Sequence, residues 1–69
     1  KLIPILNQKV NNYLNKFYLP LWIEFDNELT EKIYNINNLR VETSYGSYSG
    51  GERKRIDLSI LFSFCDLTN

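Results

Sequence analysis

Residues 21–45, LWIEFDNELTEKIYNINNLRVETSY, decide the fold class, because apolar and polar side chains alternate there with the two-residue period of β-strands. Leu21, Ile23 and Phe25 fall on one face of the first such run, which is typical of a half-buried strand. The expected elements are a strand over 21–26, a turn over 27–30, a second strand over 32–36 and a third strand over 39–45. Together they predict a three-stranded antiparallel meander.

The turn between the second and third strands is expected at Asn37-Asn38, since asparagine tolerates the positive φ that a two-residue hairpin turn requires. In that register Ile36 faces Leu39, and Tyr34 faces Val41. One side of this hairpin would then be continuously apolar.

The segment before the strands has the period of an amphipathic helix over 2–18. Pro4 fits only near the helix start, and Pro20 prevents its continuation. Polar residues, among them Asn11, are expected on the solvent face. The expected core stripe is Leu2, Leu6, Val10, Tyr13, Leu14 and Phe17.

The segment after the strands begins with a predicted loop over 46–50 and continues as a second helix from Gly51. Its second half is almost wholly apolar, so we expect that half to be buried on most sides, with Cys65 as an inert buried thiol. The expected apolar stripe is Ile56, Ile60, Leu61 and Phe64, widened by Leu58, Phe62 and Cys65. The predicted fold class is therefore α+β.

Composition excludes several kinds of site in this chain of 69 residues. It has no His and one Cys, so a histidine base, an internal disulfide and a Cys/His zinc site are all excluded. Eight basic and eight acidic residues give zero net charge, which disfavours a compact nucleic-acid binder that acts by electrostatics alone. No apolar run approaches the roughly 20 residues of a membrane span, so no membrane partner is expected.

The segment Ser49-Gly50-Gly51-Glu52-Arg53 carries the most information about function. Ser followed three residues later by Glu is the pattern of a capping box at a helix start. Two glycines in the first turn, however, cost roughly 1 kcal/mol each in helix propensity relative to Ala. Basic residues at 53–55 crowd an end where the helix dipole favours anions. Glycine permits close approach to the backbone and cations attract negative charge, so the segment also fits a phosphate site.

Residues 48–62, YSGGERKRIDLSILF, resemble the signature motif of ABC-type ATPases, whose usual form is Leu-Ser-Gly-Gly-Gln/Glu followed by a basic residue. The variant present here is similar to the coiled-coil branch of that family, which contains the SMC and SbcC-like proteins. Within that branch it looks most like the SbcC-like large subunits of phage recombination endonucleases. Tyr48 stands where the usual motif has Leu.

The resemblance implies a fragment of the C-terminal lobe of a P-loop ATPase head. Residues 1–19 would then be the end of the returning coiled-coil helix, 20–46 the antiparallel strands, and 47–69 the signature loop and helix. The order of helix, strands and motif in this chain is the order of that family.

The resemblance also implies a mechanism. The signature loop, with Ser49, Gly50, Gly51, Glu52 and Arg53, would contact the γ-phosphate of ATP held with Mg by a second, opposing head. ATP would close this homodimer and hydrolysis would open it. The implied partners are the second head, a nuclease subunit and DNA, in DNA recombination or double-strand-break repair, and the implied location is the cytoplasm of a bacterium or phage-infected host.

Two parts of the ATPase machinery are missing from these residues. The sequence has no Gly-x-x-x-x-Gly-Lys-Ser/Thr phosphate loop and no aliphatic strand that ends in Asp-Glu. We therefore expect the chain alone neither to hydrolyse ATP nor to bind it tightly, with most of the ATP and Mg contacts supplied from elsewhere. The basic residues Arg53, Lys54 and Arg55 could each add charge at the site or contact neighbouring elements.

Other functions remain open at this point. The main alternative is a small non-enzymatic α+β binding module in which Ser49–Glu52 is only a capping box; a third is a DNA-binding domain that acts by electrostatics. Ser59 and Ser63 have no histidine partner for nucleophilic catalysis. The remaining candidates are an acidic pair, Glu24 and Asp26, next to Trp22, which fits a solvated strand face better than a metal site, and the cations Lys32 and Arg40, which could touch DNA phosphates.

Overall fold

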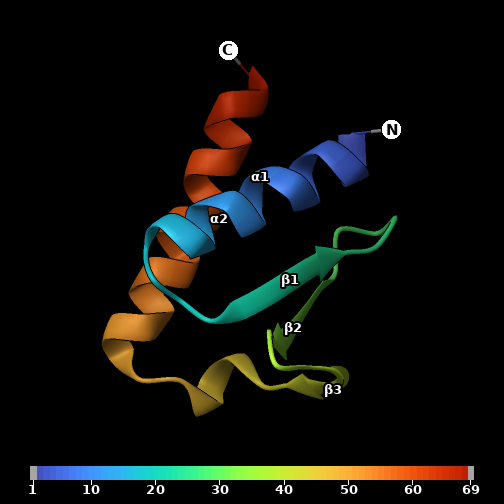
Figure 1. The fold of residues 1–69 in the computed structure, drawn as a ribbon. Helices are drawn as coiled ribbons and strands as arrows, with labels where there is room; N and C mark the ends of the chain where they lie inside the picture. Colours follow the sequence, from blue (N-terminus) through green and yellow to red (C-terminus); the bar gives the residue numbers. More distant parts are fainter. Residues whose placement is uncertain (1, 69) are drawn as a thin grey trace.

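A computed structural model describes residues 2–68 and confirms the α+β class (Figure 1). Lys1 and Asn69, the first and last residues of the predicted parts 1–19 and 47–69, lie outside the described range. The three strands form one antiparallel sheet in the order β1-β2-β3, as the meander prediction requires. The elements are α1 (Leu2–Lys16), β1 (Leu21–Phe25), β2 (Glu31–Asn35), β3 (Asn38–Thr43), the short 3-10 helix η1 (Tyr45–Ser47) and α2 (Gly50–Thr68).

The core is a small cluster between the two helices and one face of the sheet. The predicted alternation of β1 is confirmed, and three residues of the α1 stripe are buried, whereas Leu2 of that stripe is 65% exposed because no described element packs over the first turn of α1. β3 contributes no buried side chain. The buried apolar residues are Leu6, Val10, Leu14, Leu19, Leu21, Ile23, Phe25, Ile33 and Ile56.

The end of α1 is closed by a Schellman motif. Leu19 N donates to Leu14 O at 2.9 Å, and Tyr18 N donates to Asn15 O at 3.0 Å. Tyr18 takes the left-handed position, with φ 61°, which glycine usually occupies. The buried side chains of Leu14 and Leu19 supply the apolar contact that accompanies this motif, and Pro20 then directs the chain into β1.

Side chains of α1 close the outer edge of β1. Asn11 Oδ1 accepts from Ile23 N at 2.8 Å and Asn11 Nδ2 donates to Ile23 O at 2.9 Å, so one amide replaces the bonds that a neighbouring strand would make. One turn earlier, Asn7 Oδ1 accepts from Phe25 N at 2.8 Å. The prediction that Asn11 faces solvent is therefore wrong. An edge strand has unpaired backbone groups, and here α1 pairs them.

The turn between β2 and β3 differs from the prediction. It lies at Ile36-Asn37, one residue before the predicted Asn37-Asn38, because Asn35 Oδ1 accepts from Asn37 N at 2.8 Å and so forms an Asx turn there. Asn35 is then opposite Asn38, where the prediction had Ile36 opposite Leu39.

A bulge follows this turn and changes the rest of the register. Tyr34 pairs with Glu42 instead of Val41, so the three residues between Asn38 and Glu42 have no partner on β2. The expected apolar side of the hairpin consequently does not form: Ile36 is 49% exposed and Leu39 and Val41 are each more than half exposed. The third strand also ends at Thr43, before the predicted Tyr45, because Tyr45 begins η1.

The turn expected over 27–30 is confirmed, and Asp26 organises it. Asp26 Oδ1 accepts from Glu28 N at 2.9 Å and from Thr30 N at 3.0 Å. Leu29 has φ 61° in this turn. The carboxylate of Asp26 is thus used to hold the backbone together.

The face of α2 that meets α1 and the sheet contains two serines. Ile56, Ser59 and Ser63 are fully buried. The small side chains of the two serines allow α2 to approach α1 closely. The hydroxyl of Ser59 donates to Arg55 O at 2.8 Å, and that of Ser63 donates to Ser59 O at 2.7 Å. Both buried hydroxyls are therefore satisfied within the helix.

The prediction that the second half of α2 is buried on most sides is wrong. Leu61 is 54% exposed, Phe62 and Phe64 are each 38% exposed, and Cys65 is exposed, so it is not the buried thiol that the sequence suggested. The physical reason is that α1 and the sheet lie on one side of α2, and no described element packs against the other side (Figure 1). Phe62 is only partly covered, by Tyr13 and Phe17 of α1 with ring centroids 5.7 and 6.4 Å away.

Candidate anion-binding site at the start of the second helix

The loop that leads into α2 is fixed to the sheet by Tyr48. Its hydroxyl shares a hydrogen bond with Thr43 Oγ1, which in turn donates to Ile33 O at 3.1 Å. The Tyr48 ring is half-buried and packs against the core. The aromatic ring of Tyr48 is thus accommodated against the core, directly before the capping residue Ser49.

Tyr45 fixes the same loop to α2. Its hydroxyl donates to both carboxylate oxygens of Asp57, at 2.8 and 2.9 Å. The hydrogen bond to Asp57 raises the pKa of Tyr45, with smaller contributions from burial and from the charge of Asp57, because each disfavours the tyrosinate. Arg53 is close enough to act in the opposite direction on this pKa.

The capping box is confirmed. Glu52 N donates to Ser49 Oγ at 3.2 Å, while Ser49 N donates to Glu52 Oε1 at 2.9 Å. The Ser49 oxygen acts as an acceptor in this arrangement, and its hydroxyl proton stays free to donate outward. Glu52 is thereby assigned to the cap, where it holds the backbone in place.

Gly50 and Gly51 occupy the first two helical positions, where N–H groups have no acceptor within the helix. Neither glycine has a positive φ, and a Cβ added at either one would meet no atom within 4 Å. The fold of residues 2–68 therefore does not require glycine at these positions. The space beside both glycine Cα atoms is open, so no other side chain or distant backbone of the described residues lies against this part of the helix start.

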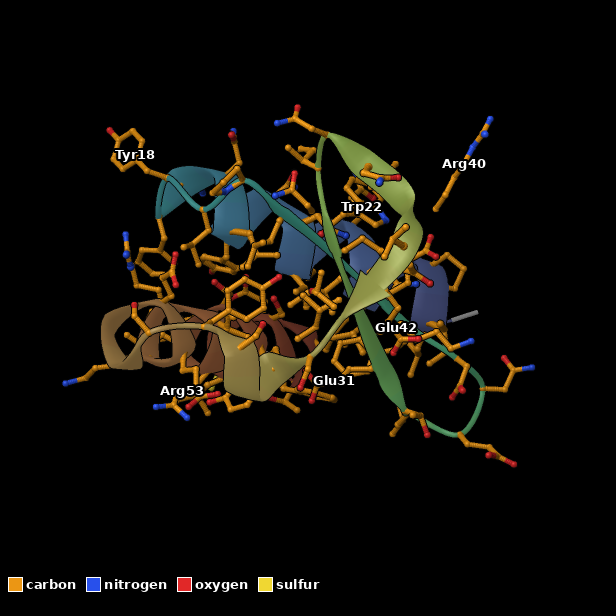
Figure 2. All side chains as sticks on the ribbon, turned by 90° about the horizontal axis from the view of Figure 1, so that it is seen from below. Tyr18, Trp22, Glu31, Arg40, Glu42 and Arg53 are labelled. Carbon is orange, nitrogen blue, oxygen red and sulfur yellow. The ribbon has the colours of Figure 1, made fainter. Side chains whose placement is uncertain are left out.

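The structure ranks the three cations that follow. Arg55 Nε donates to Gly51 O at 3.3 Å and Arg55 Nη1 donates to Phe17 O at 3.2 Å, so this guanidinium joins α2 to the end of α1. Arg53 and Lys54 are exposed, and Figure 2 shows Arg53 pointing away from the sheet. Arg53 and Lys54 are therefore the cations available to an external anion.

The other predicted site residues do not form a second site. Asp26 belongs to the turn described above, and Glu24 lies opposite Lys32 across β1 and β2. Trp22 and Glu24 line a groove of about 580 Å³ beside the asparagine-rich side of α1, and neither Lys nor Arg lines it. Arg40 lies in the bulge of β3, where Figure 2 shows it extending into solvent.

Residues 2–68 contain neither a metal cluster nor a membrane-spanning helix. No cluster of three or more His, Cys, Asp or Glu side chains in this range could hold a metal ion. Neither helix combines the length and apolar character that crossing a bilayer needs, over the same range. Glu31 has a pKa above its ordinary value, caused first by burial and then by the charge of Asp57.

Comparison with known proteins relates the chain to phage nucleases. It is similar to exonuclease subunit 2. The chain is 36% identical to that protein of Escherichia phage RB69 over 67 residues, and 35% identical to that of Enterobacteria phage T4 over 69 residues. These matches cover 97% and 100% of this chain but only 12% of each relative. No family model matches the chain, and no solved structure does.

Two structural pairs had been missed in the sequence. The spacing of Asn7 and Asn11, one turn apart on α1, was a usable signal for the closed strand edge, since it places both amides on one side of the helix. The Tyr45–Asp57 pair had no comparable signal, because the two residues belong to different elements and their contact depends on the path of the loop.

Proposed function

We propose that this chain supplies the signature loop of an SMC- or SbcC-type, ABC-type ATPase head within a phage nuclease subunit. Residues 1–19 would be the end of the coiled-coil helix, 20–46 the lobe's antiparallel strands, and 47–69 the signature loop and helix. Similarity to exonuclease subunit 2 supports the nuclease association. A role in DNA recombination or repair, with a nuclease partner and DNA, follows from the same proposal.

The single observation that carries the proposal is the unexplained glycine pair. Gly50 and Gly51 weaken the start of α2, yet neither close packing nor a positive φ in this fold demands them. Glycine at these positions is useful if something outside the chain must approach the backbone. The N–H groups at a helix start and the helix dipole favour an anion there, and a phosphate is well suited.

The residues present fit a terminal phosphate of ATP. The Ser49 hydroxyl would donate to a phosphate oxygen, the Gly50 and Gly51 amides would donate to the same group, and Arg53 would add charge. Glu52 would act only through the cap. ATP, with its Mg, would be held mainly by a second head, and contact with the terminal phosphate would distinguish ATP from ADP.

A second candidate function keeps the capping box and nothing more. The two hydrogen bonds between Ser49 and Glu52 are sufficient to explain why a helix starts here. On that account the chain is a small α+β binding module, and the start of α2 has no ligand. The two candidates differ in whether a phosphate binds at Gly50 and Gly51.

Titration of the ¹⁵N-labelled chain with inorganic tripolyphosphate separates them. We expect saturable shifts of the Gly50 and Gly51 amide signals, with a Kd on the order of millimolar for this half of a site. Ser49→Arg should abolish the shifts, whereas Thr68→Arg, which adds the same charge at the far end of α2, should leave them intact. Small, unsaturable shifts spread over all basic residues would leave only the capped helix.

A further inference from the structure

Two Tyr–Asp hydrogen bonds attach other elements to α2, one at each end of the helix. Tyr45 of η1 donates to Asp57 in the second turn of α2 at 2.8 and 2.9 Å. Tyr13 of α1 donates to Asp66 in the last turn at 2.7 Å. In both pairs the hydrogen bond to the carboxylate is the first cause of a raised tyrosine pKa. The two pairs are chemically alike but differ in what they hold.

The Tyr45–Asp57 pair holds the loop that carries the capping serine. Tyr45 begins η1, and four residues later Ser49 caps α2. Tyr48 N also donates to Tyr45 O, at 3.3 Å, so a displacement of Tyr45 is passed to the backbone next to Ser49. The Tyr13–Asp66 pair joins α1 to α2 and makes no contact with this loop.

The loop has two anchors of different strength. Tyr48 is half-buried, packs on the core and is bonded to Thr43 of the sheet, so this anchor is part of the folded structure. Tyr45 is 37% exposed and its bond to Asp57 is accessible to solvent. The Tyr45 anchor is therefore the one that we expect can be lost without unfolding. It joins the loop to the second turn of α2, in addition to the Ser49–Glu52 cap at the helix start.

We propose that Tyr45 and Asp57 are positioning residues that hold the loop before α2 in the orientation in which Ser49, Gly50 and Gly51 bind phosphate. This inference rests on the proposed function, because it assigns a control over that same site. Neither side chain touches the phosphate. Their hydrogen bond keeps the Ser49 hydroxyl next to the two glycine amides, so less conformational freedom is lost when the anion binds.

The inference predicts a specific pattern among matched variants. Tyr45→Phe and Asp57→Ala remove the hydrogen bond, and each should weaken binding of inorganic tripolyphosphate roughly fivefold. Asp57→Asn retains an acceptor oxygen for Tyr45 and should bind within about twofold of the parent chain. Tyr13→Phe removes the corresponding bond at the other end of α2 and should leave the affinity unchanged.

The measurement is the amide titration of the full chain with tripolyphosphate, combined with thermal unfolding of each variant. Tyr45→Phe and Tyr13→Phe should lower the unfolding midpoint by similar amounts, so a loss of affinity confined to Tyr45→Phe is not a general effect on stability. Equal affinities for these two variants, or a weakened Asp57→Asn, would overturn the inference alone. If the parent chain shows no saturable binding, the proposed function fails and this inference fails with it.

Discussion

The inner and outer faces of α2 contrast in a way that hydrophobicity does not predict. The inner face contains two serines and is fully buried at Ser59 and Ser63, whereas Leu61 on the outer face is 54% exposed. Phe62 lies between the two faces and is partly covered by α1. The difference arises from what lies beside each face. Small side chains allow α1 to pack closely on the inner side, and no described element covers the outer side. Burial is thus set by neighbours as much as by residue type.

The largest expected effect on this contrast comes from the centre of the inner face. Ile56→Ala should lower the free energy of unfolding by roughly 2–5 kcal/mol, because it leaves a cavity between α1, α2 and the sheet. Urea denaturation of the chain measures the change. Ile36→Ala, at a position that is 49% exposed, is the control and should cost far less. Similar losses for the two variants would show that the core is not where the structure places it.

A second change tests whether the serines are needed for close packing. Ser63→Leu adds three carbons to a fully buried position and should destabilise the chain by roughly 1–3 kcal/mol through overpacking. Cys65→Leu adds an aliphatic side chain to the exposed face and serves as the matched control. Urea denaturation again measures the change. If Ser63→Leu stabilised the chain, α1 and α2 would not be in close contact at this position.

A smaller effect is expected on the flank of α2 where Asp57 faces Glu31. The pKa of Glu31 is raised in the folded chain by burial and by Asp57, above its ordinary value of 4.5. The contribution of Glu31 to stability is therefore fully present below pH 4.5, where Glu31 is protonated in both states. It is lost as the pH rises through the higher pKa of the folded state. Glu31→Gln should stabilise the chain at pH 7, and the gain should disappear below pH 4.5.

Urea midpoints measured between pH 3 and pH 8 follow this effect. Glu28→Gln removes the same charge from the nearby turn and is the control. A Glu31→Gln variant that is less stable than the parent at pH 7 would contradict the assigned sign.

The smallest effect is expected on the outer face. Leu61→Ser should change the free energy of unfolding by less than about 0.5 kcal/mol, since Leu61 is 54% exposed. Unfolding should be measured at several protein concentrations, because an exposed apolar face could be covered by self-association. A loss of more than 1 kcal/mol that depends on concentration would show that the outer face is buried in an assembly, and the contrast between the two faces would then disappear.

These positions also show how far the sequence could determine the structure. The period-two pattern of β1 and the Ser49–Glu52 cap are local signals, and both are confirmed. The turn after β2 was misplaced, because several asparagines compete for it and the choice of Asn35 moved the register. Cys65 was misplaced because an apolar helix does not reveal how many of its sides have neighbours.

The residues of the candidate site could be predicted from the sequence, but the contacts that hold them in place could not. The sequence identified Ser49, Gly50, Gly51, Glu52 and Arg53, and the structure places them together at the start of α2. It could not show that Arg55 is bound to Phe17 O or that Tyr45 reaches Asp57, because both contacts join segments whose relative position is set by the whole fold.

The most direct test of the central claim is the association of this chain with exonuclease subunit 2 of phage T4, measured in Mg with ATP, with ADP and without nucleotide. The account predicts binding with ATP that is at least tenfold weaker with ADP, abolished by Ser49→Arg and retained by Thr68→Arg. Binding that is equal in ATP and ADP, or that survives Ser49→Arg, would contradict the account and leave the start of α2 as a capped helix only.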